Sequence, residues 1–319
     1  MSEPDKTSNI KRIIPFAQAI IVALVAWGIY RAFVNAKAEL TGQQIQFSSI
    51  RWRWLFLSGG FYAIGASAMG WFWYVLLRRL DQQPTFYATM RAFFIGHLGK
   101  YVPGKFMVVL IRTGLLKSSK VDATIAATSV FVDTLTMMAA GAFLSGVILL
   151  VRFRDQRMLQ LVAFGLMVLT AAFTIPPVLK TIIRKLKSRE SAERMSEILD
   201  RLNWSTLAIG WACALVCWCF YGLSLWAVIR SLPLADGSVI TGGTMVDLVA
   251  SVSLATVGGF VSLVPGGILV REWVLNQLMT PAFGAVVSLV APAVLRIVWL
   301  LTEILVSIIL YICVPRSQH

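Results

Sequence analysis

YVPGKFMVVLIRTGLL, residues 101–116, is an apolar segment that a Pro-Gly pair interrupts. A second segment, LVPGGILVREWVLNQL at residues 263–278, repeats the pattern, and 162 positions separate Pro103 from Pro265 in a chain of 319 residues. Lipid cannot hydrogen-bond a peptide backbone, so irregular chain at membrane depth is tolerated only where protein buries it or where it lines a wet cavity. Breaks in corresponding positions of two halves therefore predict a transport site between two related structural repeats.

The composition indicates a protein that crosses a membrane several times. Hydrophobic residues make up 58% of the chain, charged residues make up 14%, and the mean hydropathy is +0.76, whereas a soluble domain is roughly half apolar and a quarter charged. The net charge of +14 does not indicate nucleic-acid binding, because most of the cations lie between apolar segments, where they would face lipid headgroups. The cysteines lack a paired metal-binding spacing, so neither a metal nor a cofactor is expected.

Seven segments are long enough to span a membrane, since a transmembrane helix needs about 20 apolar residues. They are residues 13–33, 54–77, 123–151, 158–179, 207–229, 243–264 and 285–314. The two broken segments, about 92–118 and 265–280, are too short to cross twice as full helices, and we interpret them as re-entrant helix pairs. The expected fold is an all-α bundle of about seven to nine transmembrane segments, with the two broken segments in pseudo-related halves.

The chain is expected to form a single integral membrane domain, residues 1–319. A first half of about residues 1–179 and a second half of residues 206–319 would be joined by a cytoplasmic amphipathic linker, 180–205. This linker contains KTIIRKLKSRESAERMSEILDR, with seven cations and four anions. We interpret it as a helix lying at the headgroups, and a regulatory or lipid-sensing surface helix is the alternative.

The distribution of lysine and arginine predicts the orientation. With the N-terminus inside, the inner segments carry 15 cations and the outer segments carry 7, and cytoplasmic loops are the richer in Lys and Arg. We expect a multi-pass protein of the plasma (inner) membrane with a cytoplasmic N-terminus. The side of the C-terminus depends on whether the second broken segment crosses.

The first break carries cations at membrane depth, where charged side chains are costly and usually functional. Lys105 follows Gly104, and a helix that begins there would direct free N–H groups toward an anion. Lys105 would add a point charge, and Arg112 would add a two-pronged phosphate contact. Alternatively, Lys100 and Lys105 extend to the membrane interface. His97 is interpreted as a hydrogen-bonded structural residue, with a proton relay as the alternative.

The second break and the last span carry further charges. Arg271 and Glu272 follow the break, while Arg296 and Glu303 lie two helical turns apart in the last span. Asp133 is a lone acid in an apolar span. These charges predict either an interior polar cavity for a zwitterionic or anionic headgroup, or an ion-pair network that fixes helix packing, such as Glu272–Arg296 or Arg112–Asp133.

At these residues the chain resembles the lysylphosphatidylglycerol synthase transmembrane-region family, a flippase-like domain. The resemblance covers nearly the whole chain and depends on two ordered motifs. They are Tyr101, Val102, Pro103, Gly104, Lys105 and Arg112, and then Pro265, Gly266, Gly267, Glu272 and Arg296. Two positions differ, because members often have Arg in place of Lys105 and a glutamate in place of Asp133.

The resemblance implies a lipid flippase or transporter for an anionic or aminoacylated phospholipid or a lipid-linked cell-envelope precursor. Lys105, Arg112, Arg271 and Arg296 would hold the phosphate, and Asp133, Glu272 and Glu303 would be polar cavity partners. In two-domain relatives this region moves aminoacylated phosphatidylglycerol. Their soluble synthase domain is not expected here, because the sequence ends at His319.

Two other functions compete with the flippase. One is a non-transporting accessory subunit of a glycosyltransferase or lipid-modifying enzyme, which would be the protein partner. The other, an intramembrane enzyme, is not favoured, because the sequence shows no acidic metal-binding cluster or metalloprotease motif. The expected partners are therefore membrane lipids, and no nucleic acid.

Overall fold

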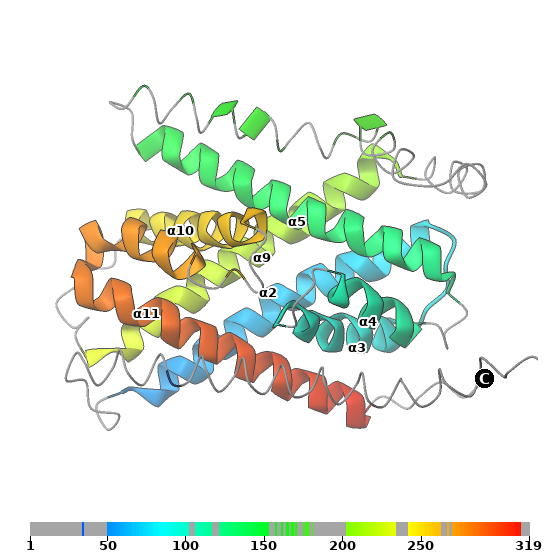
Figure 1. Ribbon diagram of the computed structural model, residues 1–319, viewed down its shortest axis with the longest axis horizontal. Helices are drawn as coiled ribbons and strands as arrows, with labels where there is room; N and C mark the ends of the chain where they lie inside the picture. The colour runs from blue at the N-terminus through cyan, green and yellow to red at the C-terminus, as the bar shows by residue number, and fades with distance from the viewer. Residues whose placement is uncertain are drawn as a thin grey trace, which may run out of the picture.

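The computed structural model of the chain describes residues 50–101, 106–116, 121–152, 202–233, 242–262 and 270–313, with residue 34, residue 267 and scattered positions from 157 to 181. These residues form helices and contain no strand. The helices form a bundle (Figure 1). They are α2 (Trp52–Arg79), α3 (Phe86–His97), the 3-10 helix η2 (Leu98–Tyr101), α4 (Met107–Leu116), α5 (Ala123–Arg152), α9 (Trp204–Ser231), α10 (Gly242–Val261) and α11 (Val270–Cys313).

Five of these helices are long and apolar enough to cross a membrane: α2, α5, α9, α10 and α11. They match five of the predicted spans, 54–77, 123–151, 207–229, 243–264 and 285–314, so the all-helical membrane fold is confirmed. The predicted span 13–33 lies outside the described residues. The span 158–179 and the linker 180–205 contain only some described positions.

Polar side chains set the starts of three helices. Thr85, Asp122 and Asn203 lie just before α3, α5 and α9, and each accepts a hydrogen bond from the backbone N–H three residues ahead, at 3.2, 3.0 and 2.9 Å respectively. Such caps satisfy one of the free N–H groups at a helix start, and each typically contributes about 1 kcal/mol. The helix boundaries therefore follow from local sequence as well as from apolar length.

The helices α2 and α9 form an antiparallel pair at the centre of the bundle. At one end the backbone N–H of Arg51 donates to the carbonyl of Ser231 at 3.0 Å, and at the other end Arg79 Nη1 donates to Ser205 Oγ at 2.7 Å. Both helices have 28 residues. Each half of the chain therefore contributes one long central helix of the same length and opposite direction.

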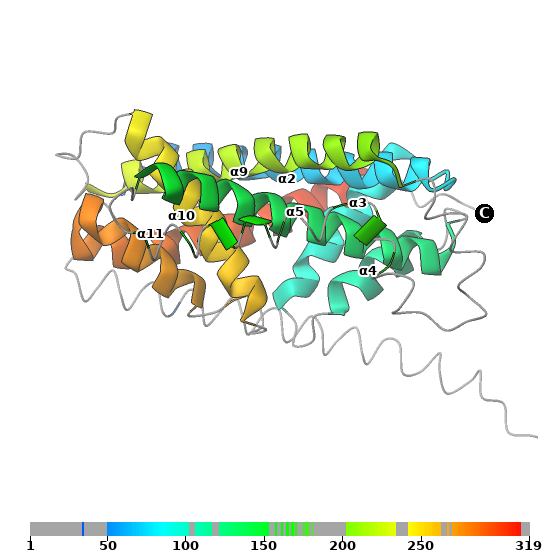
Figure 2. The same cartoon turned by 90° about the horizontal axis from the view of Figure 1, so that it is seen from above.

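Two further contacts join helices from opposite halves of the chain. Helix α3 of the first half packs against α11, and α10 of the second half packs against α5. The same arrangement is visible from two sides in Figures 1 and 2, where α5 and the last part of α11 run in opposite directions. The packing of one half thus has a counterpart in the other.

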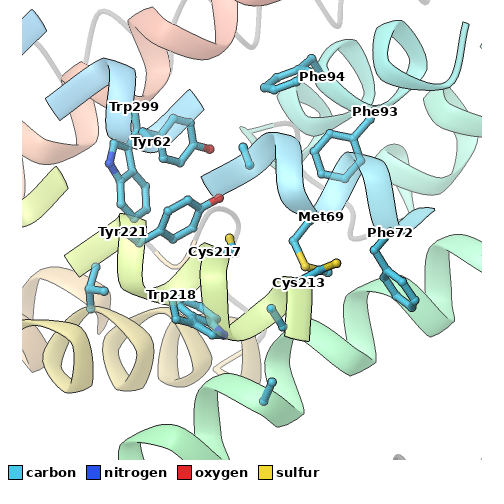
Figure 3. Packing of buried hydrophobic residues seen from close by; sticks show 14 of the residues in the cluster. Tyr62, Met69, Phe72, Phe93, Phe94, Cys213, Cys217, Trp218, Tyr221 and Trp299 are labelled. Carbon is cyan, nitrogen blue, oxygen red and sulfur yellow. The ribbon is translucent and has the colours of Figure 1, made fainter. Parts of the chain in front are cut away.

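Aromatic residues fill the core where α2, α9 and α11 meet (Figure 3). The ring centroids of Tyr62 and Trp299 lie 4.6 Å apart, those of Tyr62 and Tyr221 lie 4.9 Å apart, and those of Tyr221 and Trp299 lie 4.6 Å apart. All three side chains are buried. Large aromatic side chains contribute strongly to packing, so this cluster holds the central helices together.

Helix α11 consists of two parts that meet at Gly284. This residue has φ 76° and ψ 166°, which are not helical angles. Only glycine adopts this region readily, so Gly284 separates residues 270–283 from residues 285–313. The last predicted span begins at this break.

Candidate functional site

Two ion pairs named among the sequence-based alternatives are present in the structure. Arg112 Nη1 on α4 lies 2.9 Å from Asp133 Oδ2 on α5, and Arg296 Nη1 lies 2.6 Å from Glu272 Oε1, both on α11. Each pair joins the helix that follows a Pro-Gly break to the long helix after it. The charges are exchanged between the halves, because the short helix carries the cation in the first half and the anion in the second.

The two ion pairs differ in burial. The side chains of Arg112 and Asp133 are only 3% and 5% exposed, whereas those of Arg296 and Glu272 are 17% and 29% exposed. The first pair is therefore sealed inside the bundle. The second is the more accessible of the two.

A third cluster surrounds Glu303, whose side chain is completely buried. The Tyr62 hydroxyl and the Lys100 ammonium both donate to Glu303 Oε1. The sequence predicts Glu303 as a polar cavity partner, but it gives no signal for Tyr62, which comes from α2. Helix packing alone brings the tyrosine to the carboxylate.

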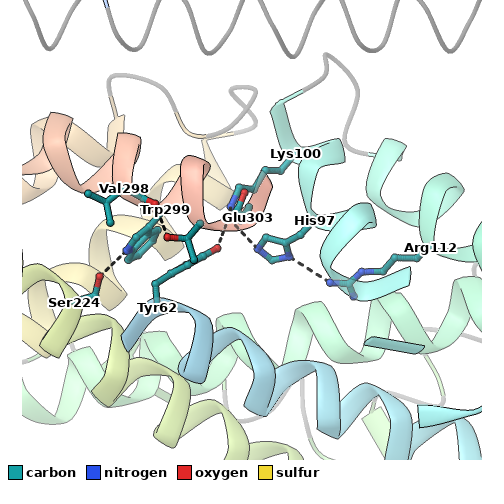
Figure 4. Close-up of polar contacts among 9 residues, drawn as sticks. Tyr62, His97, Lys100, Arg112, Ser224, Val298, Trp299 and Glu303 are labelled. Carbon is teal, nitrogen blue, oxygen red and sulfur yellow. Dashed lines mark hydrogen bonds and ion pairs between the residues drawn. The ribbon is translucent and has the colours of Figure 1, made fainter. Parts of the chain in front are cut away.

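His97 connects the charge clusters of the two halves (Figure 4). Its Nδ1 lies 3.4 Å from Arg112 Nη2, and its Nε2 lies 4.0 Å from Glu303 Oε1. Because a guanidinium only donates, Nδ1 must accept, and the proton of the neutral ring then lies on Nε2, facing Glu303. A continuous line of polar contacts therefore runs from Asp133 through Arg112 and His97 to Glu303.

Arg271 is held in a narrow passage between two glycines. A Cβ added to Gly259 would lie 2.6 Å from Arg271 Cγ, and one added to Gly267 would lie 3.1 Å from Arg271 Cδ. Gly267 also has a φ of 64°. The guanidinium lies over the Trp299 ring, 4.9 Å from its centroid. Glycine at these positions is what allows the side chain to reach the aromatic core.

The first half holds Arg112 in a similar way. A Cβ on Gly96 would lie 2.3 Å from Arg112 Cγ, and the guanidinium lies 4.1 Å from the centroid of the Phe93 ring. In each half, a glycine of the helix before the break receives an arginine of the helix after it. The difference is that Arg112 has a carboxylate partner, whereas within the described residues Arg271 has none.

All three acids of the site use one oxygen for an ion pair and leave the other without a partner among the described residues. Asp133 Oδ1, Glu272 Oε2 and Glu303 Oε2 are buried and accept no hydrogen bond from the described part of the protein. Buried polar atoms of this kind are commonly satisfied by internal water or by a ligand. The site therefore has spare acceptors beside its cations.

Several predicted site residues lie outside the described part of the chain. They are Pro103, Gly104, Lys105, Pro265 and Gly266. The described residues contain no group of three His, Cys, Asp or Glu side chains that could hold a metal ion.

Apolar spanning helices around a buried charged interior define a multi-pass integral membrane protein, since ionisable side chains at membrane depth typically face the interior of the bundle. Residues 16–308 match the family described as the lysylphosphatidylglycerol synthase TM region. The chain belongs to this family, as its two Pro-Gly motifs predict, and membership relates it to the handling of membrane lipids. No curated protein matches the chain.

Proposed function

We propose that this protein is a flippase that binds a lipid by its phosphate and moves it between the two leaflets of the membrane. The substrate is an anionic or aminoacylated phospholipid or a lipid-linked precursor of the cell envelope. The membrane is the plasma (inner) membrane. The N-terminus lies in the cytoplasm, an orientation supported by the distribution of Lys and Arg. Family membership supports a role with lipids.

The observation that carries the proposal is the position of Arg271. Within the described residues it is the one cation of the site without a carboxylate partner, and it lies over Trp299 close to the start of α11. The N-terminus of a helix favours an anion, and arginine binds phosphate through paired N–H groups. Arg271 is therefore the first contact we assign to the phosphate.

The other predicted phosphate ligands would act differently. Arg296 is partly exposed and paired with Glu272, so a phosphate could replace the carboxylate at little cost in desolvation. Arg112 is sealed beside Asp133, and we propose that it positions His97 and becomes accessible only when α4 moves. Lys105 stays in the proposal as a further point charge at the first break.

Short helices at the first break support a re-entrant segment. With a rise of 1.5 Å per residue, α3 and α4 span roughly 18 and 15 Å, about half of a hydrocarbon core. The antiparallel α2–α9 pair supports two inverted repeats, for which rocking of one half against the other gives alternating access. Together with the spans outside the described residues, the total would be seven to nine crossings.

The protein moves lipid in this proposal without catalysing a chemical step. The alternative, an accessory subunit that moves no lipid, would need the buried charges only for packing. Arg271 favours transport over that alternative, because within the described residues it has no carboxylate partner to neutralise it, whereas a charge kept only for packing is usually paired.

The test is lipid movement in proteoliposomes with fluorescent phosphatidylglycerol, aminoacylated phosphatidylglycerol or polyprenyl phosphate. We expect wild-type protein to move at least one of them and Arg271→Gln to lose about tenfold or more, since a charged hydrogen bond contributes about 1.5–3 kcal/mol. Arg78→Gln, which changes an exposed cation at the end of α2, is the matched control and should keep wild-type rates. Absence of movement with every lipid would overturn the flippase and favour the accessory subunit.

A further inference from the structure

An apolar groove lies between the first broken segment and the end of α11. It is a shallow, open groove with a volume of about 490 Å³. Its lining includes Ile95, Leu98, Ile304, Ser307, Ile308 and Ile312. The side chains of Ile308 and Ile312 are 50% and 75% exposed, so the outer part of the groove opens on the surface that faces lipid.

The inner end of this groove adjoins the charged site. Leu98 follows His97 and precedes Lys100 by two residues, and Ile304 follows Glu303 directly. The Lys100 side chain is 24% exposed, and Arg271 lies within electrostatic range of it. The groove therefore lies beside the charged cluster along both η2 and α11.

Ser307 gives an independent sign of a ligand. Its side chain lines the groove, the residue is only 6% exposed, and its hydroxyl has no hydrogen-bond partner among the described residues. A buried hydroxyl without a partner is destabilising, because it loses its hydrogen bonds to water. A ligand that carries an acceptor at this depth would remove that cost.

The order of groups along α11 matches the order of groups in a phospholipid. Glu303 with its lysine partner comes first, Ser307 follows one turn later at a rise of roughly 6 Å, and Ile308 and Ile312 lie beyond it. A phospholipid presents a phosphate, then ester carbonyls, then hydrocarbon chains. The carbonyl is the acceptor that the Ser307 hydroxyl lacks.

We propose that this groove holds one acyl chain of a phospholipid whose phosphate lies against Lys100 and Arg271 and whose ester carbonyl accepts from Ser307. The proposal rests on the proposed function and narrows its substrate to an anionic phospholipid, because Lys100 and Arg271 are both cations beside the groove and, of the two, only Lys100 has a carboxylate partner within the described residues. In this proposal, lipid enters the protein sideways from the bilayer through the same groove, between α3 and α11.

The experiment is photolabelling of the full-length protein in phosphatidylcholine nanodiscs. The probe is phosphatidylglycerol with a diazirine in one acyl chain, and mass spectrometry of peptides locates the adducts. We expect adducts at Ile308 and Ile312 that excess phosphatidylglycerol removes and excess phosphatidylcholine does not. Leu305 and Ile309 are exposed residues of the same helix outside the groove, and their adducts should fall equally with either competitor.

A pair of variants tests the groove itself. Ser307→Phe fills the groove and should lower labelling of Ile312 about tenfold, since a buried site tolerates added volume poorly. Leu305→Phe adds the same kind of side chain on the exposed face and should leave labelling unchanged. Equal competition by both lipids, or undiminished labelling in Ser307→Phe, would overturn the proposal, as would a protein segment crosslinked in the groove in place of lipid.

Labelling and transport separate the two proposals. Selective groove labelling without lipid movement would support the binding site and overturn the flippase. Lipid movement that persists in Ser307→Phe, with unselective labelling, would support the flippase and overturn the groove as its entrance.

Discussion

Arg112 and Glu303, from opposite halves of the chain, contact opposite ring nitrogens of His97, at 3.4 and 4.0 Å. One imidazole therefore lies between the sealed ion pair of the first half and the buried carboxylate of the second. A displacement of α3 would change both contacts together. The polar interior of the two halves is coupled through this residue.

Glu303→Gln should destabilise the protein, because it leaves the Lys100 ammonium without its carboxylate partner. Removal of one member of a buried pair typically costs about 3–5 kcal/mol. The Glu303→Gln/Lys100→Gln double variant should regain most of that loss, since no charge is then left alone. Thermal unfolding in detergent of the wild type, both single variants and the double variant gives the coupling energy. Additive losses would show that the two side chains do not interact.

Arg112→Lys should behave as a disruptive change although it keeps the charge. Arg112 uses Nη1 for Asp133 and Nη2 for His97, and a single ammonium cannot reproduce this fork. We expect a lower unfolding temperature and slower lipid movement than in the wild type. Arg79→Lys is the control, because that guanidinium uses Nη1 alone for its hydrogen bonds at the end of α2. If Arg112→Lys behaved like the wild type, the contacts of Arg112 would not be needed to couple the two halves.

Gly284→Ala should lower the free energy of unfolding through the backbone alone. No atom would lie within 4 Å of the new Cβ, but a φ of 76° with a ψ of 166° is strained for alanine by about 1–3 kcal/mol. Gly114→Ala is the matched control, since its Cβ also meets nothing within 4 Å and Gly114 lies within helix α4. That variant should be neutral or slightly stabilising. Equal unfolding temperatures for the two variants would show that the break in α11 is unimportant for stability.

Gly259→Ala should reduce lipid movement by displacing Arg271 from Trp299. The added Cβ would lie 2.6 Å from Arg271 Cγ, whereas at the adjacent Gly258 the nearest atom, Val274 Cγ2, would be 3.9 Å away. Gly258→Ala therefore provides a control one residue along the same helix. We expect a loss similar to that of Arg271→Gln for Gly259→Ala and wild-type rates for Gly258→Ala, measured in the same proteoliposomes. Equal rates in both variants would mean that the position of Arg271 does not matter.

Much of the fold could be predicted from the sequence, because a helix that crosses a membrane appears as an uninterrupted apolar stretch of about 20 residues. Residues 123–151 and 207–229 needed no knowledge of their neighbours to be recognised as spans. The pair Arg112–Asp133 could be named because each charge is isolated in an apolar surrounding and needs a partner. Tyr62 could not be identified, since its role depends on how α2 packs against α11, and no local pattern records that contact.

The sequence analysis also did not predict the glycines that make room for the Arg112 and Arg271 side chains. Gly96 and Gly259 look like ordinary small residues of apolar helices, and only the path of the arginine side chain explains them. The sequence does contain a signal that could have found them. In each half, a glycine precedes the Pro-Gly break and an arginine follows it, but the spacing differs between the halves.

The antiparallel α2–α9 pair has a consequence for how such a chain can arise. It forms the most extensive helix contact in the described structure, and it joins the halves as an interface joins the subunits of a two-fold dimer. Two separate copies of an ancestral half, inserted into the membrane in opposite directions, would meet through the same surfaces. Duplication of the gene would then free each copy to diverge, and the exchange of charge between Arg112–Asp133 and Glu272–Arg296 is a difference that two identical copies could not carry.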